Sequence, residues 1–506
     1  MLLLLLLLLL LLLLTPLQWT ELVQGVGGME LIEWQALVVG RFSLEQPEAV
    51  LLRCSGVPAF HVGGAQSSPA AGDAYFGSQQ MGQVMQLPAG EHFVRARLRA
   101  KHQGRVACSV EVQRNRDPSI ALAAAFSPDW VAGDAEPLGG VAALTVHNKG
   151  QHQLTDFVVT VEVGGSSGDR TAAIVSASLL EPLSLAPSQH SSLRLQLSAT
   201  SAGRAFCDTE GDAGNERKVM LLVNGRTAGP VMDGGGAAPE RRSVHGRAAL
   251  TLRCRGGKSS AIMTFLDEDG SVQHAGVVRP PAAAACARSG SGAGCPVLLT
   301  LHGTGISASD SADAFKRKVR SSDDDFTFGV EQGYVLAPSR HGAHNWEGVG
   351  RLSALAALKA LQRTMNSAAN GDQTAANVDA SRVLVVGHSM GGHGAALLYA
   401  TIPDVAVGLS MNAGWLRKEQ YGDDNTLWMH DSALHAAEPA LRSVLESTIS
   451  ENFADALVTN FASPALLRVG EKDRSVHPWY SRRLARLLRA RKADYAYSEL
   501  PGKEHW

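Results

Sequence analysis

A ten-residue segment, Leu384-Val-Val-Gly-His-Ser-Met-Gly-Gly-His393, constrains the fold of this chain more than any other part of its sequence. The apolar residues that lead into it indicate a strand, and the small residues that follow indicate a helix. Between them Ser389 lies in a Gly-x-Ser-x-Gly motif, whose glycines suit a turn too tight for side chains. The segment predicts a nucleophilic serine at a strand-to-helix turn, where the first N–H groups of the helix face an oxyanion. The alternative is a glycine-rich turn with an idle serine.

A histidine and an acid suited to activating Ser389 follow strand patterns later in the chain. Asp473 comes after a strand pattern that ends in Gly-x-x-Asp, and His505 follows the last strand pattern. This is one of the chain orders of a catalytic triad, in which the histidine is the general base and the acid orients it. His477 is the alternative base and Glu471 the alternative acid, because both lie in the loop that contains Asp473.

An upstream loop supplies candidate donors for the oxyanion. The motif His302-Gly-Thr-Gly follows a buried-strand pattern, so we expect it at the carboxyl edge of the sheet. Backbone N–H groups bind an oxyanion well because they are fixed before the reaction begins. We therefore expect the N–H of Met390 to act together with that of Gly303 or Thr304.

Together these motifs resemble the catalytic domain of α/β-hydrolases of the prolyl oligopeptidase/dipeptidyl peptidase-like group. The resemblance covers residues from about 260 to 506 and rests on four motifs: His302-Gly-Thr-Gly, Gly387-His-Ser-Met-Gly-Gly, Gly470-Glu-Lys-Asp and Gly502-Lys-Glu-His. It implies Ser389 as nucleophile, His505 as base and Asp473 as acid, with an acyl-enzyme intermediate and no cofactor. The His-Gly-x-Gly motif is shared with esterases, and no blade-length repeat of a propeller precedes residue 260. A small peptide and an ester are therefore both expected as substrates.

A hypothesis from a different class is a catalytically weak binding protein built on a hydrolase fold. Only six residues follow the last strand pattern, Ala493–Leu500. Parallel sheets are normally buried on both faces, so we expect a longer natural chain or a second chain over one face. Without such cover, His505 is expected to be loosely held.

Four histidines are expected to line the substrate pocket. His302 and His388 belong to the motifs above, and His341 and His344 follow a strand pattern at the carboxyl edge, where ligands bind. Two histidines three residues apart suit a metal, but no third histidine or carboxylate stands at a ligand spacing, so no metal site is expected. His388 and His393 are expected to pack rather than to act as bases.

The spacing of strand and helix patterns predicts the fold class. Strands alternate with helices in residues 256–506, which predicts an α/β-hydrolase with a mostly parallel sheet and helices on both faces. Within it we expect a small helical cap at about 416–463. Short strand patterns upstream predict two β-sandwich modules, at residues 17–125 and 126–255, the second immunoglobulin-like. Helical patterns lie at Ala312–Val319, Arg351–Met365 and Ser481–Arg489.

The N-terminus carries a homopolymer. Thirteen leucines follow Met1, which is too short a run to span a bilayer but suits the core of a signal peptide. We interpret residues 1–16 as a signal peptide or an anchor, which predicts a secreted protein or membrane attachment through the leucine run. If the run is a repeat artefact or a misplaced start, the protein is cytoplasmic.

Charge and cysteine content bound the partners and the compartment. The net charge of −2 gives no reason to expect nucleic acid as a partner. The six cysteines contain no Cys-x-x-Cys, which excludes a zinc ribbon. In an exported protein we expect disulfides between Cys54 and Cys108 and between Cys286 and Cys295. In a reducing compartment we expect these cysteines to be buried free thiols.

Overall fold

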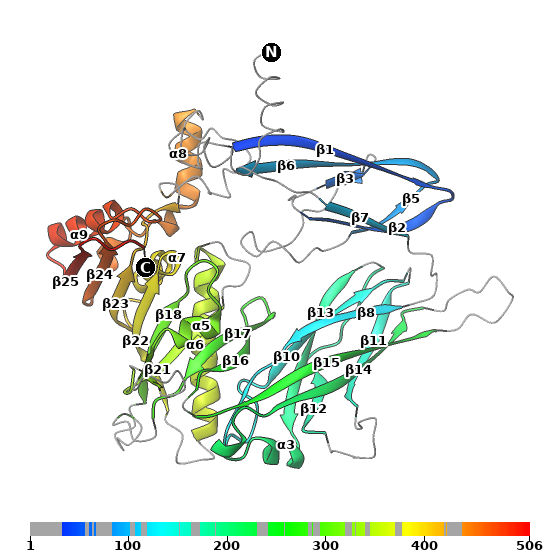
Figure 1. Cartoon of the computed structure of the whole chain (residues 1–506), viewed down its shortest axis with the longest axis horizontal. Helices are drawn as coiled ribbons and strands as arrows, with labels where there is room; N and C mark the ends of the chain where they lie inside the picture. The colour runs from blue at the N-terminus through cyan, green and yellow to red at the C-terminus, as the bar shows by residue number, and fades with distance from the viewer. Residues whose placement is uncertain are drawn as a thin grey trace. The chain divides into compact units, whose positions relative to one another are not determined.

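The computed structural model describes residues 33–505 with gaps, and Figure 1 shows its elements along the chain. The leucine run, His341 and His344 lie outside the described residues, so the predictions made for them stay predictions. In the described part, no helix is long and apolar enough to cross a membrane. The chain divides into two units, Met1–Arg116 and Asp117–Trp506. The gaps are at 56–59, 63–64, 67–82, 102–106, 113–118, 151, 163–172, 188, 230–240, 258, 282–285, 287–293, 319–325, 329, 340–344, 370–376, 419–420 and 422–437.

The first unit contains two sheets around one hydrophobic core. Its strands are β1 (Glu33–Leu44), β2 (Glu48–Ser55), β3 (Phe60–Val62), β4 (Ala65–Gln66), β5 (Gln83–Leu87), β6 (Gly90–Lys101) and β7 (Ala107–Val112). They form sheets of order β1-β6-β3-β4 and β5-β2-β7. Leu52, Val62 and Val94 are buried in the shared core, as expected for strands that turn one face inward. The predicted disulfide between Cys54 and Cys108 is confirmed and joins β2 to β7.

Residues 119–255 of the second unit form two four-stranded sheets, of order β12-β13-β10-β8 and β11-β14-β15-β9. Trp130, Leu144 and Leu252 belong to one core between them. A disulfide that was not predicted, Cys207–Cys254, lies in the same core. The elements are β8 (Ile120–Phe126), β9 (Trp130–Val131), β10 (Val141–Asn148), β11 (Leu154–Val161), β12 (Val175–Leu179), β13 (His190–Ala199), α3 (Ser201–Phe206), β14 (Glu216–Thr227) and β15 (Ser243–Arg255).

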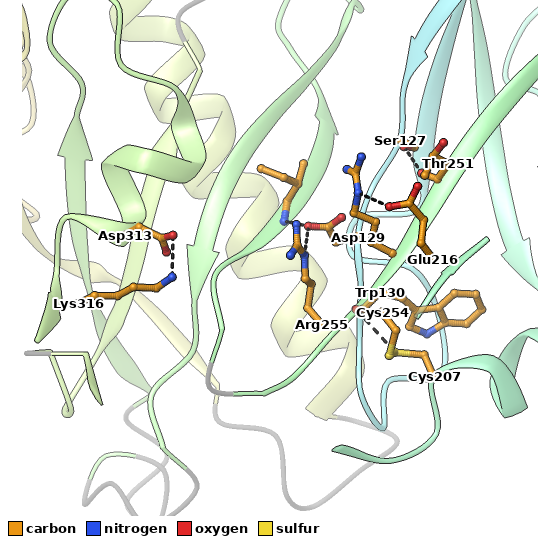
Figure 2. A network of polar contacts seen from close by, with 12 residues as sticks. Ser127, Asp129, Trp130, Cys207, Glu216, Thr251, Cys254, Arg255, Asp313 and Lys316 are labelled. Atoms are coloured by element: carbon orange, nitrogen blue, oxygen red, sulfur yellow. Dashed lines mark hydrogen bonds and ion pairs between the residues drawn. A yellow bond between two sulfur atoms is a disulfide. The ribbon is translucent and has the colours of Figure 1, made fainter. Parts of the chain in front are cut away.

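A buried carboxylate connects these strands to the rest of the second unit. Figure 2 shows Asp129 beside Arg255, the last residue of β15. Asp129 accepts hydrogen bonds from Arg255 Nε at 3.1 Å and from the backbone N–H of Ile262 at 2.9 Å. Its own N–H donates to Ile262 O at 2.9 Å. Asp129 thus ties the end of β15 to the first strand of the next sheet.

That sheet has eight strands in the order β16-β17-β21-β18-β22-β23-β24-β25 (Figure 1). β16 and β17 pair antiparallel, and β17 pairs antiparallel with β21. The remaining pairs are parallel, from β21 to β25. The strands are β16 (Ala261–Leu266), β17 (Val272–Val278), β18 (Cys295–Leu301), β21 (Tyr334–Pro338), β22 (Val378–His388), β23 (Ala406–Asn412), β24 (Ala465–Gly470) and β25 (Tyr495–Leu500). The predicted disulfide Cys286–Cys295 is confirmed at the start of β18.

Helices cover both faces of this sheet, as predicted. Val386 packs in one cluster with Ala312 of α5 (Ala308–Asp313). A Cβ at the next residue, Gly387, would instead meet the backbone of Gly391 in α7 (Met390–Thr401). Neighbouring strand residues point to opposite faces, so α5 and α7 lie on opposite sides. The mostly parallel sheet of an α/β-hydrolase is therefore confirmed.

Two of the three predicted helices are confirmed, as α6 (Val349–Ala369) and α9 (Trp479–Arg491). The third, predicted at Ala312–Val319, is wrong in position. The helix begins earlier because the Ser307 hydroxyl accepts a hydrogen bond from Asp310 N and caps α5. Lys316–Lys318 is then a strand, β19, paired with β20 (Phe326–Phe328).

The described residues do not test two predictions for this domain, the helical cap over the site and the cover over one face of the sheet. Helix α8 (Pro439–Thr448) lies in the segment predicted as a cap, and its Leu441 and Val444 are exposed among the described residues. On the α5 face of the sheet, Leu384 and Leu466 are 37% and 41% exposed. A cap over the site, and further residues or a second chain over this face, both stay predictions.

Candidate active site

Ser389 occupies a strained turn between β22 and α7. Its φ is 58°, a backbone conformation that is uncommon for residues other than glycine and is often found at functional sites. A Cβ at Gly387 would lie 2.0 Å from Gly391 O, and one at Gly391 would lie 1.8 Å from Leu301 O. Both flanking positions therefore require glycine, which is the physical reason for the Gly-x-Ser-x-Gly motif in this chain.

The His302 loop approaches this turn from β18. A Cβ on Gly303 would lie only 3.6 Å from Ser389 Cβ and 3.3 Å from His388 O. Met390 is the first residue of α7, so its N–H has no helical carbonyl to bind. Thr304 is exposed at the tip of the loop, and its hydroxyl lies 3.8 Å from Met390 Sδ. The predicted oxyanion donors thus come from two segments that meet beside Ser389.

Asp473 and His505 are in direct contact. His505 Nδ1 lies 2.7 Å from Asp473 Oδ2, and the Asp473 side chain is completely buried. The other carboxylate oxygen, Oδ1, accepts hydrogen bonds from Ser475 N at 2.9 Å and Val476 N at 2.8 Å. Because both oxygens are engaged, the carboxylate has one orientation and fixes Nδ1 of His505 as the protonated nitrogen.

The loop that carries His505 is held by main-chain contacts. A Cβ on Gly470 would lie 2.1 Å from Glu504 O, so the loop packs directly on the end of β24. Lys472 N donates to Lys503 O at 2.8 Å. Gly502 N donates to the carboxylate of Glu471 at 2.7 Å. Glu471, the alternative acid, is therefore engaged with the backbone of this loop.

The alternative base, His477, takes a different position. It is exposed, and its Nδ1 accepts a hydrogen bond from Trp479 N at 3.1 Å at the start of α9. It makes a local turn contact, whereas His505 makes the contact with Asp473. The structure therefore favours His505 over His477 as the partner of Asp473.

His388 contacts the backbone of His505. Its Nε2 lies 2.8 Å from His505 O, and because a carbonyl only accepts, Nε2 must carry the proton. The two rings are 4.7 Å apart. Burial lowers the pKa of His388, and the hydrogen bond to the His505 carbonyl offsets part of that shift. Sequence reasoning assigned His388 to packing and to the pocket and did not anticipate this contact.

A cavity of about 710 Å³ opens at the carboxyl edge of the sheet. His302, Gly303, His388 and His505 line it, together with apolar residues that flank α5 and apolar residues of the strands. His302 is nearly buried, and its backbone carbonyl accepts from Trp346 Nε1 at 3.0 Å. Two of the four predicted pocket histidines, His302 and His388, thus lie on one cavity with His505.

A second buried histidine lies behind the nucleophile turn. His393, in the first turns of α7, is fully buried, with Nδ1 3.2 Å from Trp415 O and Nε2 3.0 Å from Glu347 Oε1. Both partners are acceptors, so a neutral His393 donates to one of them and a doubly protonated His393 donates to both. This contact joins the loops after β21 and β23 to α7. Only the position of His393 four residues after Ser389 hinted at it in the sequence.

The part of the chain that the structure describes holds no cluster of metal-ligating side chains. In that part of the chain, no group of three or more His, Cys, Asp or Glu side chains lies close enough to hold a metal ion. The prediction of no metal site is not tested at His341 and His344, which lie outside it.

The C-terminal part of the chain matches a known family. Residues 367–506, which include Ser389, Asp473 and His505, match the model of the prolyl oligopeptidase family. A protein of Arthroderma benhamiae (strain ATCC MYA-4681 / CBS 112371) named "Uncharacterized secreted protein" is 27% identical over 272 residues. That match covers 53% of this chain, and the chain spans 27% of the length of this relative.

The solved structures to which this chain is similar include hydrolases of several kinds. A thermostable esterase is 15% identical, with coverage of 74% of this chain and 91% of the esterase and a TM-score of 0.31. A puromycin-hydrolyzing peptidase of Mycobacterium tuberculosis is 19% identical (76% and 59% coverage, TM-score 0.36). An S-formylglutathione hydrolase from Agrobacterium tumefaciens is 18% identical (49% and 88% coverage, TM-score 0.33). These TM-scores are low, so the fold assignment rests on the strand order and the family match. Residues 367–506 are therefore similar to the catalytic part of prolyl oligopeptidase-family proteins.

Proposed function

We propose that this chain cleaves a peptide or ester bond through Ser389, His505 and Asp473, and that it is most like a serine peptidase of prolyl oligopeptidase type. A carboxylesterase of the same fold is the alternative. The observation that carries the proposal is the 2.7 Å contact between His505 Nδ1 and the buried Asp473. It lies at the sheet edge where β22 ends in the strained Ser389 turn.

The geometry suits general-base catalysis. With Nδ1–H directed at Asp473, His505 keeps Nε2 free of a proton and can accept the one from Ser389 Oγ as Oγ attacks the carbonyl carbon. The N–H groups of Met390 and of Gly303 or Thr304 stabilise the oxyanion. His505 then gives its proton to the leaving group. Water, activated by the same histidine, releases the acid from Ser389.

The chain acts outside the cytoplasm in this proposal. Its three disulfides are typical of secreted proteins, and the name of the Arthroderma benhamiae relative contains the word secreted. Residues 1–16 serve as the signal peptide. The upstream strands form two β-sandwich modules, the second immunoglobulin-like. The boundary between them lies near residue 117 and not at 126, because β8 (Ile120–Phe126) pairs with β10, and the paired sheets with shared cores support both modules.

Hydrolysis of small chromogenic substrates tests the proposal. We expect the full chain to cleave p-nitrophenyl acyl esters, peptide anilides or both, and Ser389→Ala and His505→Ala to lose about 10⁴-fold or more of kcat. His477→Ala is the matched control and should keep wild-type turnover. Cleavage of esters alone identifies a carboxylesterase. Undiminished turnover by folded Ser389→Ala would refute the assignment of Ser389 as the nucleophile. If the folded wild type turned over neither substrate, the hypothesis of a binding protein built on a hydrolase fold would remain.

A further inference from the structure

The nucleophile and the base of the proposed triad come from distant parts of the chain. His505 lies 117 positions after His388, the neighbour of Ser389. Asp473 fixes the direction of the His505 ring, but that contact does not set how far His505 lies from the Ser389 turn. A misplacement of about 1 Å between reacting groups can cost roughly 10²-fold in rate. Some contact between the two segments must therefore control their separation.

The side chain of His388 makes such a contact. The glycine before it faces α7, so by strand alternation His388 points to the opposite face, toward the C-terminal loop. There Nε2–H donates to His505 O at 2.8 Å. The backbone of His388 belongs to the rigid turn, because Ser389 N donates to Asn412 O on the adjacent strand at 2.9 Å. A fixed turn is thus bonded through one ring to the residue that must be positioned.

Charge makes a neutral donor necessary here. When His505 accepts the proton of Ser389 it becomes an imidazolium, and a second positive ring 4.7 Å away would disfavour that state. The partial burial of His388 keeps its ring neutral, since burial is the main cause of its lowered pKa. A lysine or arginine at this position would donate the same bond but add the unfavourable charge. A neutral histidine supplies the bond alone.

We propose that His388 is a positioning residue, which sets the place of His505 relative to Ser389 through its hydrogen bond to the His505 carbonyl. This inference rests on the proposed function of the triad. It assigns a role to the variable residue of the Gly-x-Ser-x-Gly motif. The C-terminal loop is then held from two sides, by Gly470 and Lys472 on β24 and its loop and by His388 on β22.

Two substitutions separate the hydrogen bond from the volume of the side chain. His388→Leu removes the donor, and we expect kcat to fall about 10- to 100-fold with KM within about twofold. His388→Gln places an amide N–H near the position of Nε2, and we expect it to recover most of that loss. His388→Asn is polar but too short to reach the carbonyl, so it should resemble His388→Leu. If His388→Leu does not fold, His388→Asn takes its place as the variant that lacks the hydrogen bond.

A double-mutant cycle distinguishes positioning from a general structural role. In a His505→Ala background the carbonyl remains but the base is gone, so adding His388→Leu should change the residual kcat by less than about twofold. The proposal would be overturned if His388→Leu and His388→Asn had the kcat of the wild type. It would also be overturned if His388→Gln had a kcat no higher than theirs. An equal further loss in the His505→Ala background would also overturn it. If His505→Ala itself keeps wild-type activity, the proposed triad fails instead.

Discussion

Replacing Asp473 by asparagine tests its link to His505 without changing the size of the side chain. Oδ1 accepts from Ser475 N and Val476 N, so the asparagine oxygen must keep that side to satisfy both donors. The amide nitrogen then takes the place of Oδ2, which lies 2.7 Å from His505 Nδ1 in the wild type. Two donors cannot meet, so His505 takes the tautomer protonated at Nε2 and cannot accept the proton of Ser389. We expect kcat to fall about 10⁴-fold, or about 5 kcal/mol in the barrier.

The assay is steady-state hydrolysis of whichever p-nitrophenyl ester or peptide anilide the wild type cleaves, with folding checked by circular dichroism. Glu471→Gln is the matched control, because Glu471 is exposed and its amide oxygen can still accept from Gly502 N. Its kcat should stay within about twofold of the wild type. If folded Asp473→Asn turned over within tenfold of the wild type, the orientation argument would be refuted.

Two further predictions concern stability. Gly391→Ala places a Cβ 1.8 Å from Leu301 O and should cost about 3 kcal/mol or more in the free energy of unfolding, whereas Gly229→Ala, whose Cβ meets nothing within 4 Å, should be neutral in the same urea titration. Burial, with a smaller effect of His302, lowers the pKa of His274 to about 4, and its Nδ1 has no hydrogen-bond partner among the described residues. As the pH falls, His274 therefore binds a proton in the unfolded chain at a higher pH than in the folded chain. About 3 kcal/mol in the free energy of unfolding should be lost as the pH falls from about 6.5 to 4. His274→Phe should remove that part of the loss, and an unchanged acid limb would contradict the assignment.

Local chemistry explains which parts of the site were predictable. The glycines around Ser389 are required by contacts within a few residues and with one neighbouring strand, so the motif alone identifies the turn. Asp473 and His505 each follow a strand, and chain order in a parallel sheet brings such residues to one edge. These features depend on the topology and not on details of packing.

The missed features depend on packing between distant segments. The contact of His388 with the His505 carbonyl spans 117 positions, and that of His393 with Glu347 spans 46. No periodicity or spacing encodes which rotamer each ring adopts. The misplaced helix at Ala312–Val319 has a similar cause, because Lys316–Lys318 has little strand propensity of its own and is a strand through its pairing with Phe326–Phe328.

Covalent labelling by a fluorophosphonate probe tests whether Ser389 is an activated nucleophile, because the probe needs such a serine and no knowledge of the substrate. We expect a single adduct on Ser389, located by peptide mass spectrometry, that is absent in Ser389→Ala and forms far more slowly in His505→Ala. A folded wild type that is not labelled, or an adduct on another residue, would contradict the assignment of Ser389 as the nucleophile.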